Sequence, residues 1–512
     1  MKKQKAAKVR GVFTGYDDVW PGDIWPCSTP EDQGVDSTRL LDMLKVVKSK
    51  NIGIDALLVI RNGQLIMEMY RYPYKADTLH HIYSCTKSFT SALIGIAIEE
   101  GRIKGLSQRI EDFFSDRQIA NLDKAKRTIT LGNLLTMSSG YKWLGGMLEQ
   151  PTLQEWWKSP DWIQYVLDRP LSDPPGTRFV YNTGCSHLLS AVLQRSVGMN
   201  TEAFAKSRLF APLGIKDWHW QTDPQGISTG GYGLWLRPRD MAKLGYLYLN
   251  DGKWDHGQIV PAEWVTESIR KHIEAGAPWL SDGYGYHWWV DGQGYYMALG
   301  FGGQFIVALP DRNLIMVTTS SLSPNDFFMP ETLLKDFILP GSQASAPIPQ
   351  NPEAVAELND CILELAGQEG TAVPSLPPTA LRISGKTYVR SDDAKTDSPG
   401  APGWKTASLA FTQGDESAFF IEDGVSIEIG LDGRYRAFAP SLGGKKLPFP
   451  RSARDMGRGY WKGDSEFIIE HFLLGDAGRF VDTFRFQGDT LVWRQEAPTY
   501  GYSLWIKGLM KQ

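Results

Sequence analysis

The alternation of apolar and polar residues predicts strands at both ends of the first 340 residues. An apolar, β-branched run at Asp55–Ile60, the turn pair Asn62-Gly63 and a returning run at Leu65–Tyr70 have the pattern of a β-hairpin. Four more strand-like runs come late in this region: Tyr284–Val290, Tyr295–Leu299, Phe305–Pro310 and Asn313–Thr319. We therefore expect an antiparallel sheet that is built from the two ends of the region.

Helices are predicted before and between those strands. Phe89, Leu93, Ile96 and Ala97 recur at helical spacing until Gly101, the type of residue that commonly follows the last turn of a helix. The other predicted helices are Ser37–Lys48, a capped helix within Ile129–Gly140, Trp156–Leu167, His187–Val197 and Arg239–Leu249. This order predicts an α+β fold, in which an antiparallel sheet is flanked by helices and a helical subdomain spans about residues 103–225.

The chain changes character after residue 340. Prolines flank one short predicted helix, Glu353–Leu365, which indicates a linker at residues 341–380. From 381 to 512, short strands alternate with turns such as Asp423-Gly424. This last segment is expected to be a separate, antiparallel, all-β domain with the shape of a small barrel.

Composition narrows the class of protein. The 512 residues are 42% apolar and 22% charged with a formal net charge of -4, values of an ordinary globular protein that lacks a basic surface for nucleic acid. No apolar run approaches the length of a membrane span, and the four cysteines show neither metal-ligand nor disulfide spacing. We therefore expect no metal, no cofactor and no nucleic-acid or membrane partner. The oligomeric state stays open.

The first residues bear on location. Residues 1–35 are polar with Gly and Pro, and are expected to be an N-terminal extension of a domain at 36–340. The basic start, Met1–Lys5, is not followed by the apolar stretch of a signal peptide. A cytoplasmic protein is expected, and a secreted or periplasmic one stays open if a leader was removed.

One stretch, Tyr83–Thr90, carries the candidate chemistry. Ser84 falls where a loop enters the apolar helix, and Lys87 follows one turn later on the same face. The backbone alone thereby holds a hydroxyl and an amine within reach, as Ser-x-x-Lys acyl-transfer enzymes require. The same four residues also fit a helix N-cap with a solvated lysine, so their context decides between the two.

Several motifs in one order resemble the serine β-lactamase and penicillin-binding-protein superfamily over about residues 30–325. Ser84-Cys85-Thr86-Lys87 matches S-x-x-K, Tyr181-Asn182-Thr183 falls at Y-x-N, and Ala298-Leu299-Gly300 falls at K-T-G. Stretches typical of the class C-like branch, which holds esterases, D-aminopeptidases and 6-aminohexanoate-dimer hydrolases, are Leu134–Gly140, Pro175–Thr177 and Phe210–Ile215. The resemblance implies a β-lactamase/transpeptidase-like fold, and the C-terminal β-domain resembles the lipocalin-like appendages of some members.

The resemblance also implies roles for named residues. Ser84 would be the nucleophile, and Lys87 and Tyr181 would share the task of its base, because a serine hydroxyl needs a positioned base near neutral pH. The two titrate as a coupled pair, so neither is assigned as the sole base. The backbone N–H groups of Ser84 and Phe301 would form the oxyanion hole. The candidate substrate-binding residues are Thr183, Tyr232, Gly300 and Trp289.

Two departures from the family pattern bear on the substrate. Thr183 replaces the amide of Y-x-N with a shorter hydroxyl, which changes the contacts available to a substrate amide. Ala298-Leu299-Gly300 lacks the lysine and threonine that, in the family, resemble a site for the β-lactam carboxylate. The expected function is therefore that of a serine hydrolase acting on carboxylic esters through an acyl-enzyme.

Other functions stay open beside that one. Amidase or peptidase activity on small or linear amides, such as 6-aminohexanoate oligomers or D-amino-acid peptides, is the runner-up, and acyl transfer or peptide cyclisation is a further alternative. A true β-lactamase and a catalytically silent binding protein are disfavoured. Cys85 is expected in the core, about 100° around the helix from Ser84. His80, His81 and His187 are expected to be structural, since the G-x-S-x-G motif that a Ser-His-Asp triad would need is absent.

Overall fold

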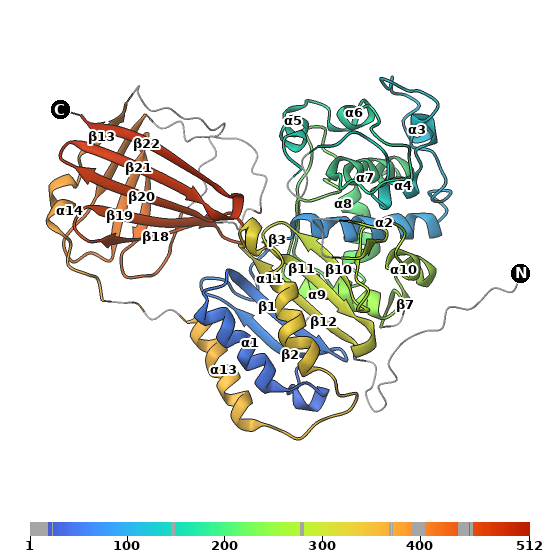
Figure 1. The fold of residues 1–512 in the computed structure, drawn as a ribbon, viewed down its shortest axis with the longest axis horizontal. Helices are drawn as coiled ribbons and strands as arrows, with labels where there is room; N and C mark the ends of the chain where they lie inside the picture. Colours follow the sequence, from blue (N-terminus) through green and yellow to red (C-terminus); the bar gives the residue numbers. More distant parts are fainter. Residues whose placement is uncertain are drawn as a thin grey trace, which may run out of the picture.

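The computed structural model describes residues 19–22, 24–144, 149–255, 257–276, 281–367, 370, 372–391, 405–438, 450 and 454–511. Residues 1–18 of the predicted N-terminal extension lie outside these ranges. The described chain forms a layered sheet-and-helix unit, a cluster of helices above it and a C-terminal β-structure beside both (Figure 1). Among the described helices, none has both the length and the apolar composition that crossing a bilayer requires.

An antiparallel sheet of seven strands, counted over the described residues, forms the centre of the first unit, in the order β2-β1-β12-β11-β10-β9-β8. The strands are β1 (Ile54–Arg61), β2 (Gln64–Tyr70), β8 (Gly283–Tyr284), β9 (Trp289–Val290), β10 (Tyr296–Gly300), β11 (Gln304–Leu309) and β12 (Leu314–Ser320). The predicted hairpin is present, and Asn62 and Gly63 have φ of 53° and 76°, as a type I′ turn requires. The pairing of β1 with β12 joins the two ends of the region.

Helices cover both faces of this sheet. The described helices are α1 (Ser37–Ser49), α2 (Thr86–Glu99), α3 (Ile110–Phe113), α4 (Leu131–Leu135), α5 (Thr152–Lys158), α6 (Trp162–Leu167), α7 (Thr183–Val197), α8 (Thr201–Ala205), α9 (Pro238–Leu249), α10 (Ala262–Ser268), α11 (Met329–Leu333), α12 (Leu339–Gly341), α13 (Pro352–Ala366) and α14 (Pro378–Ile383). Ala56 and Leu58 of β1 face the core that contains α2 and α9, whereas Leu57 and Val59 face the core that contains α1. Because both faces are buried, β1 is a continuous apolar run.

Short strands add to this unit away from the central sheet. Within the described residues, one small sheet has the order β3-β5-β4 and another pairs β6 with β7. Their bounds are β3 (His80–His81), β4 (His219–Trp220), β5 (Leu234–Leu236), β6 (Lys253–Trp254) and β7 (Gly257–Gln258). Strand β3 leads directly into the turn that carries Ser84.

The helix predicted inside the linker is α13, and it packs against α1. Leu358, Cys361 and Leu365 of α13 are buried in the same core as Leu40 and Leu44 of α1. This helix is therefore part of the first unit's core, although the segment around it is rich in proline. The domain boundaries themselves stay a prediction.

Two predicted elements were wrong, because each is divided in two. The helix predicted at 156–167 is α5 and α6, since Ser159 is extended (φ -68°, ψ 140°) and Pro160 cannot donate a helical hydrogen bond. Asp161 then caps α6 by accepting a hydrogen bond from the Gln164 N–H. The strand predicted at 284–290 is β8 and β9, and His287 between them has φ of 62°, outside the strand region.

The C-terminal strands close into a barrel. Over the described residues the sheet has ten strands in the order β16-β15-β14-β13-β22-β21-β20-β19-β18-β17, and a further pairing of Gly430 in β16 with Arg458 in β18 closes it. The strands are β13 (Thr387–Arg390), β14 (Thr406–Ala410), β15 (Ser417–Glu422), β16 (Val425–Gly430), β17 (Arg436–Phe438), β18 (Asp455–Lys462), β19 (Glu466–Leu473), β20 (Phe480–Gln487), β21 (Thr490–Ala497) and β22 (Tyr502–Met510). The predicted α+β class with an additional C-terminal β-barrel is confirmed.

Aromatic side chains fill the interior of the barrel. Phe420, Phe484 and Trp493 pack together, with ring centroids 5.2–5.6 Å apart. The gap that Phe420 and Phe484 line with Tyr388 has no room for a water molecule. The described interior is thus a packed core.

Candidate active site

Ser84 lies in a tight turn that leads into α2. The turn η2 (Tyr83–Cys85) immediately precedes the helix, and Tyr83 has φ of 46°. A left-handed conformation costs a non-glycine residue about 1–2 kcal/mol, so the surrounding structure must hold it. Every residue of α2 from Thr86 to Ala97 is buried. The Ser84 hydroxyl therefore stands at the end of a fixed helix.

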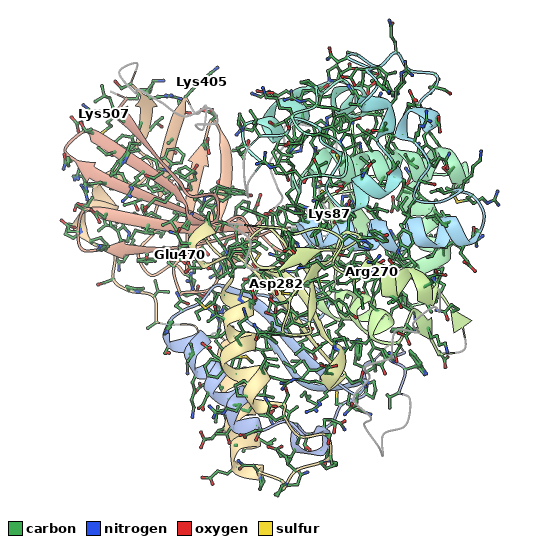
Figure 2. All side chains as sticks on the ribbon, turned by 45° about the vertical axis from the view of Figure 1, so that its right-hand side comes forward. Lys87, Arg270, Asp282, Lys405, Glu470 and Lys507 are labelled. Carbon is green, nitrogen blue, oxygen red and sulfur yellow. The ribbon has the colours of Figure 1, made fainter. Side chains whose placement is uncertain are left out.

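Lys87 lies one turn after Ser84, in the interior of the molecule (Figure 2), and is only 1% exposed. Its Nζ atom donates to Ser84 Oγ at 2.9 Å, to Thr183 Oγ1 at 3.0 Å and to the Gly231 carbonyl at 2.8 Å. Burial lowers the pKa of Lys87 to about 8, and the charge of Glu149 opposes that shift. The carbonyl can only accept, and the Thr183 proton is donated to Glu149. When the ammonium loses a proton, its lone pair therefore faces Ser84.

A buried carboxylate that no sequence motif marks completes this network. Glu149 accepts hydrogen bonds from the Thr183 N–H at 2.6 Å, from the Thr183 hydroxyl and from Trp143 Nε1 at 2.7 Å. Burial raises the pKa of Glu149, and the charge of Lys87 opposes the rise. The Thr183 hydroxyl thus donates its proton to Glu149. The sequence predicts a substrate contact for Thr183, which stands where the family has an amide side chain. Glu149 lies in a loop with φ of 52°, so no periodic pattern could have located it.

Tyr181 approaches Ser84 from the residues that precede α7. It forms a hydrogen bond with Ser84, and its ring centroid lies 4.7 Å from Lys87 Nζ. The ring stacks on Trp289 of β9, with centroids 5.8 Å apart and planes at 24°. Burial, followed by the charge of Glu149, raises the pKa of Tyr181 above its ordinary value of 10.0. The Ser84 hydroxyl therefore contacts both the Lys87 amine, whose pKa is lowered, and the Tyr181 phenol, whose pKa is raised.

A cleft of about 600 Å³ lies over Ser84. Gly300, at the end of β10, lies against the Ser84 turn, where a Cβ atom would be 2.4 Å from the Ile82 carbonyl oxygen. Only glycine allows this close approach. Apart from the buried Lys87, all the predicted site residues line the cleft: Ser84, Tyr181, Thr183, Tyr232, Trp289, Gly300 and Phe301. Their roles in catalysis and binding stay predictions.

Two histidines and a cysteine near the site are buried side chains outside the cleft wall. His287 Nδ1 lies 3.1 Å from the Lys87 carbonyl oxygen. His187 Nε2 lies 3.0 Å from a carboxylate oxygen of Asp223, and the side chains of His187 and Asp223 are fully buried. Cys85 is buried in the core, as predicted, and burial raises the pKa of its thiol. Among the described residues, no group of three or more His, Cys, Asp or Glu side chains is arranged to hold a metal ion.

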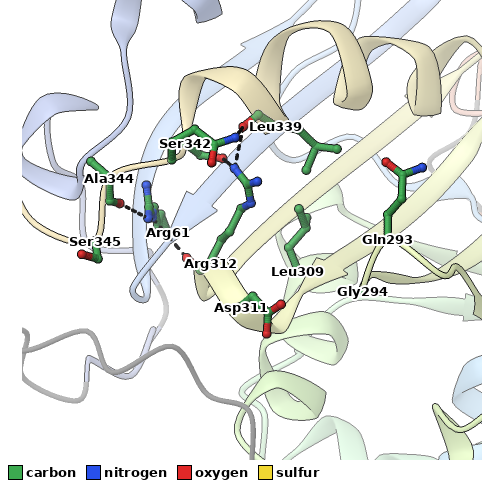
Figure 3. Close-up of a pocket in the computed structure, with 11 residues that line it drawn as sticks. Arg61, Gln293, Gly294, Leu309, Asp311, Arg312, Leu339, Ser342, Ala344 and Ser345 are labelled. Carbon is green, nitrogen blue, oxygen red and sulfur yellow. Dashed lines mark hydrogen bonds between the residues drawn. The ribbon is translucent and has the colours of Figure 1, made fainter.

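A second hollow, of about 330 Å³, has a different character (Figure 3). Two of its lining residues are Arg61 and Arg312. Arg61 donates to the carbonyls of Gly34, Ala344 and Arg312, and Arg312 donates to that of Leu339. These guanidinium groups hold chain segments together, and the lining residues include no paired nucleophile and base. The cleft over Ser84 is therefore the candidate active site.

Comparison with known proteins agrees with this geometry. The Beta-lactamase family profile matches residues 45–337, more than half of the chain. The chain belongs to the Beta-lactamase family. The match covers the central sheet, α2 and α7, and therefore the elements that carry Ser84, Lys87 and Thr183.

The family is of the serine-hydrolase type, and the chain is similar to individual members over part of their length. The chain is 24% identical over 244 residues to 6-aminohexanoate-dimer hydrolase of Paenarthrobacter ureafaciens, which covers 46% of this chain and 60% of that protein. It is 28% identical over 237 residues to lovastatin esterase of Penicillium rubens, and that match covers 36% of this chain and 58% of that protein. A solved structure, the octameric penicillin-binding protein homologue of Pyrococcus abyssi, aligns with a TM-score of 0.48 and 16% identity over 92% of this chain and 100% of that one. The chain thus spans about 60% of the length of the curated relatives it matches.

Proposed function

We propose that this protein is a serine hydrolase that cleaves carboxylic esters through an acyl-enzyme on Ser84. The observation that carries the proposal is the 2.9 Å separation of Lys87 Nζ and Ser84 Oγ beneath the cleft. Tyr181 forms a hydrogen bond with the same hydroxyl. A base within hydrogen-bond reach is what converts a serine hydroxyl into a nucleophile. The similarity to an esterase supports the choice of reaction.

In the acylation step, the neutral Lys87 amine accepts the Ser84 proton as Oγ bonds to the ester carbonyl carbon. The backbone N–H groups of Ser84 and Phe301 stabilise the negative charge on the carbonyl oxygen, an effect worth about 3 kcal/mol for each donor. Tyr181 keeps its proton until then, because its pKa is raised. The departing alkoxide takes the Tyr181 proton, which Lys87 then replaces. The alcohol leaves, and an ester bond to Ser84 remains.

In the deacylation step, water repeats the attack on that ester bond. Its proton passes to Lys87, its oxygen bonds to the acyl carbon, and Ser84 Oγ leaves with the proton. The products are the free acid and the original enzyme. Thr183 and Glu149 act here as positioning residues. Thr183, which Glu149 holds by a hydrogen bond, accepts from Lys87 and orients its amine. The charge of Glu149 raises the pKa of Lys87 and so affects how readily it gives up its proton.

The charge of the cleft favours esters over anionic β-lactams. Among the described residues that line it are the carboxylates of Glu149 and Asp476, and no lysine or arginine. Ala298-Leu299-Gly300 supplies no cation where the family has K-T-G. The carboxylate of a β-lactam would therefore lie near like charge without a partner. Small or linear amides are the second candidate, on the strength of the match to 6-aminohexanoate-dimer hydrolase.

A substrate panel tests the proposal. Wild type and Ser84→Ala are assayed with p-nitrophenyl esters, 6-aminohexanoate oligomers and nitrocefin. We expect the esters to give the highest kcat/KM, nitrocefin the lowest, and Ser84→Ala no turnover above background. Turnover of nitrocefin faster than that of the esters would contradict the proposal. An added alcohol or amine acceptor distinguishes hydrolysis from acyl transfer by the products formed.

A further inference from the structure

Two connecting segments of the C-terminal barrel form part of the wall of the active-site cleft. Asp476, in the loop between β19 and β20, and Tyr500, just before β22, both line it. The neighbouring Gly475 accepts a hydrogen bond from the His81 N–H at 2.8 Å. A Cβ atom on Gly475 would lie 2.0 Å from the carbonyl oxygen of Leu79, the residue before β3. The Asp476 loop therefore approaches the start of β3 as closely as a glycine permits. The position of Asp476 relative to the Ser84 turn is thus fixed by direct contact.

The groups around Asp476 favour its charged form. Its Oδ1 accepts from the Tyr83 hydroxyl at 2.7 Å and from the Gly478 N–H at 2.9 Å, and its Oδ2 lies 3.4 Å from His81 Nδ1. The Gly233 N–H donates to His81 Nε2 at 3.1 Å, so Nε2 is the acceptor of the ring and Nδ1 is the ring nitrogen that faces Asp476. Burial disfavours the charge, but the hydrogen bond and the electrostatic attraction of His81, together with the hydrogen bonds from Gly478 and Tyr83, outweigh burial and lower the pKa of Asp476.

The positive charge of the Lys87 ammonium is compensated by Glu149 and not by Asp476. Lys87 directs its three protons to Ser84, Thr183 and Gly231, and the carboxylate of Glu149 compensates its charge. No other lysine or arginine lies among the described residues of the cleft wall. Asp476 therefore leaves the cleft with an excess negative charge, and its Oδ2 has room for one more donor.

Aromatic side chains line the same wall of the cleft as this carboxylate. Phe301 stacks on Tyr500 with ring centroids 5.5 Å apart, and Tyr83 lies 5.3 Å from Phe301. Ring faces and a carboxylate both attract an organic cation, the rings through their quadrupole and the carboxylate through its charge. The combination, next to the predicted oxyanion amide of Phe301, is a site for an ammonium group on the substrate.

We propose that the substrates of this hydrolase carry a positively charged amine, and that Asp476 of the C-terminal barrel binds it while the scissile carbonyl lies at Ser84. This inference rests on the proposed function and names its substrate class. Asp476 is then a specificity-determining residue that a second structural unit supplies to the active site.

Two p-nitrophenyl esters that differ only in charge test the inference. One is the ester of γ-trimethylammonio-butanoate, and the other is its neutral isostere, in which a tert-butyl group replaces the trimethylammonium group. We expect wild type to prefer the cationic ester by about tenfold in kcat/KM, and Asp476→Asn to lose most of that preference. Glu416→Gln removes the same charge from an exposed barrel residue (side chain 71% exposed) and should leave the ratio unchanged. If Asp476 only braces Tyr83, Asp476→Asn will slow both esters equally, which overturns the inference.

A binding measurement needs no turnover. Hexylammonium and hexanol are titrated calorimetrically into Ser84→Ala and into Ser84→Ala combined with Asp476→Asn. We expect Ser84→Ala to bind the amine about tenfold more tightly than the alcohol, and the double variant to bind them equally. Equal affinities in Ser84→Ala overturn the ammonium site. Absence of both ester turnover and fluorophosphonate labelling of Ser84 refutes the proposed function instead, and this titration still decides the ammonium site.

Discussion

The Nζ atom of Lys87 lies 2.9 Å from Ser84 Oγ, and its other two hydrogen bonds go to groups that accept from it. A neutral Lys87 amine can therefore present its lone pair only to the Ser84 proton. The protonated amine cannot act as a base at all. Activity should thus follow the protonation state of this one side chain.

The first prediction concerns the pH dependence of wild type. Because burial lowers the pKa of Lys87 to about 8 and the neutral amine is the active form, kcat/KM for a neutral ester should rise with pH through a midpoint near 8. The pH profile of kcat/KM measures this, since it reports the groups of the free enzyme. A rate that falls as pH rises through the same range would assign the base to another group.

The second prediction concerns Glu149. Its charge raises the pKa of Lys87 against the effect of burial, so Glu149→Gln should move the midpoint of the pH profile to lower pH. The variant keeps an acceptor for Thr183. Glu155→Gln, at an exposed side chain bonded to the Tyr165 hydroxyl, is the matched control and should leave the midpoint in place. An upward shift in Glu149→Gln would show that the carboxylate does not act on Lys87.

The third prediction concerns the two groups that handle the proton. Lys87→Met keeps most of the length of the side chain without the amine, and Tyr181→Phe keeps the ring that stacks on Trp289 without the hydroxyl. Each should reduce kcat/KM by about 10²–10⁴-fold, the usual contribution of general acid–base catalysis.

The fold should survive both changes. Circular dichroism and the thermal unfolding midpoint check this, and Tyr165→Phe, which removes a hydroxyl outside the cleft wall, should retain wild-type rates. Near-normal turnover in Tyr181→Phe or Lys87→Met would refute the role of that residue.

The fourth prediction concerns the contact between the barrel and the central sheet. Arg479 donates to Asp55 at 2.9 Å and to the Tyr74 hydroxyl at 2.7 Å, and its guanidinium carbon lies 3.6 Å from the Phe472 ring centroid. The Asp55 side chain is only 3% exposed. Arg479→Ala would leave that carboxylate buried without its cation, a loss of about 3 kcal/mol.

A second arginine provides the control for this stability measurement. Arg485 is half-exposed and paired with Glu466, so Arg485→Ala should cost less than about 1 kcal/mol. Thermal unfolding midpoints compare the two variants. Adding Asp55→Asn to Arg479→Ala should recover part of the loss. Equal midpoints for the two single variants would show that the buried pair does not stabilise the contact.

Sequence patterns could locate Ser84 and Lys87 because both obey the spacing of one helix. The same is true of the hairpin, where Asn62-Gly63 specifies its own turn. Tyr181 depended on the family resemblance, since nothing local distinguishes it from another buried tyrosine. Around Pro160 the apolar spacing was misleading, because a proline and an extended Ser159 separate two helices that share one apolar pattern.

Glu149 and Asp476 could not be located from the sequence, and the physical reason is the same for both. Glu149 and Asp476 lie in loops without periodicity, and their partners are far away in the chain: the Asp476 hydrogen bond with Tyr83 spans 393 positions. Contacts of this kind depend on how the barrel sits against the central unit. A single sequence carries no local pattern that encodes such a contact.

The most direct test of the central claim is to find the covalent intermediate. Wild type is incubated with a p-nitrophenyl ester, quenched in acid within the first turnovers and digested, and the acylated peptide is identified by mass spectrometry. We predict that the acyl group is attached to Ser84, that Ser84→Ala carries none, and that the label disappears once the substrate is exhausted. An acyl group on another residue, or ester turnover that persists in Ser84→Ala, would contradict the account.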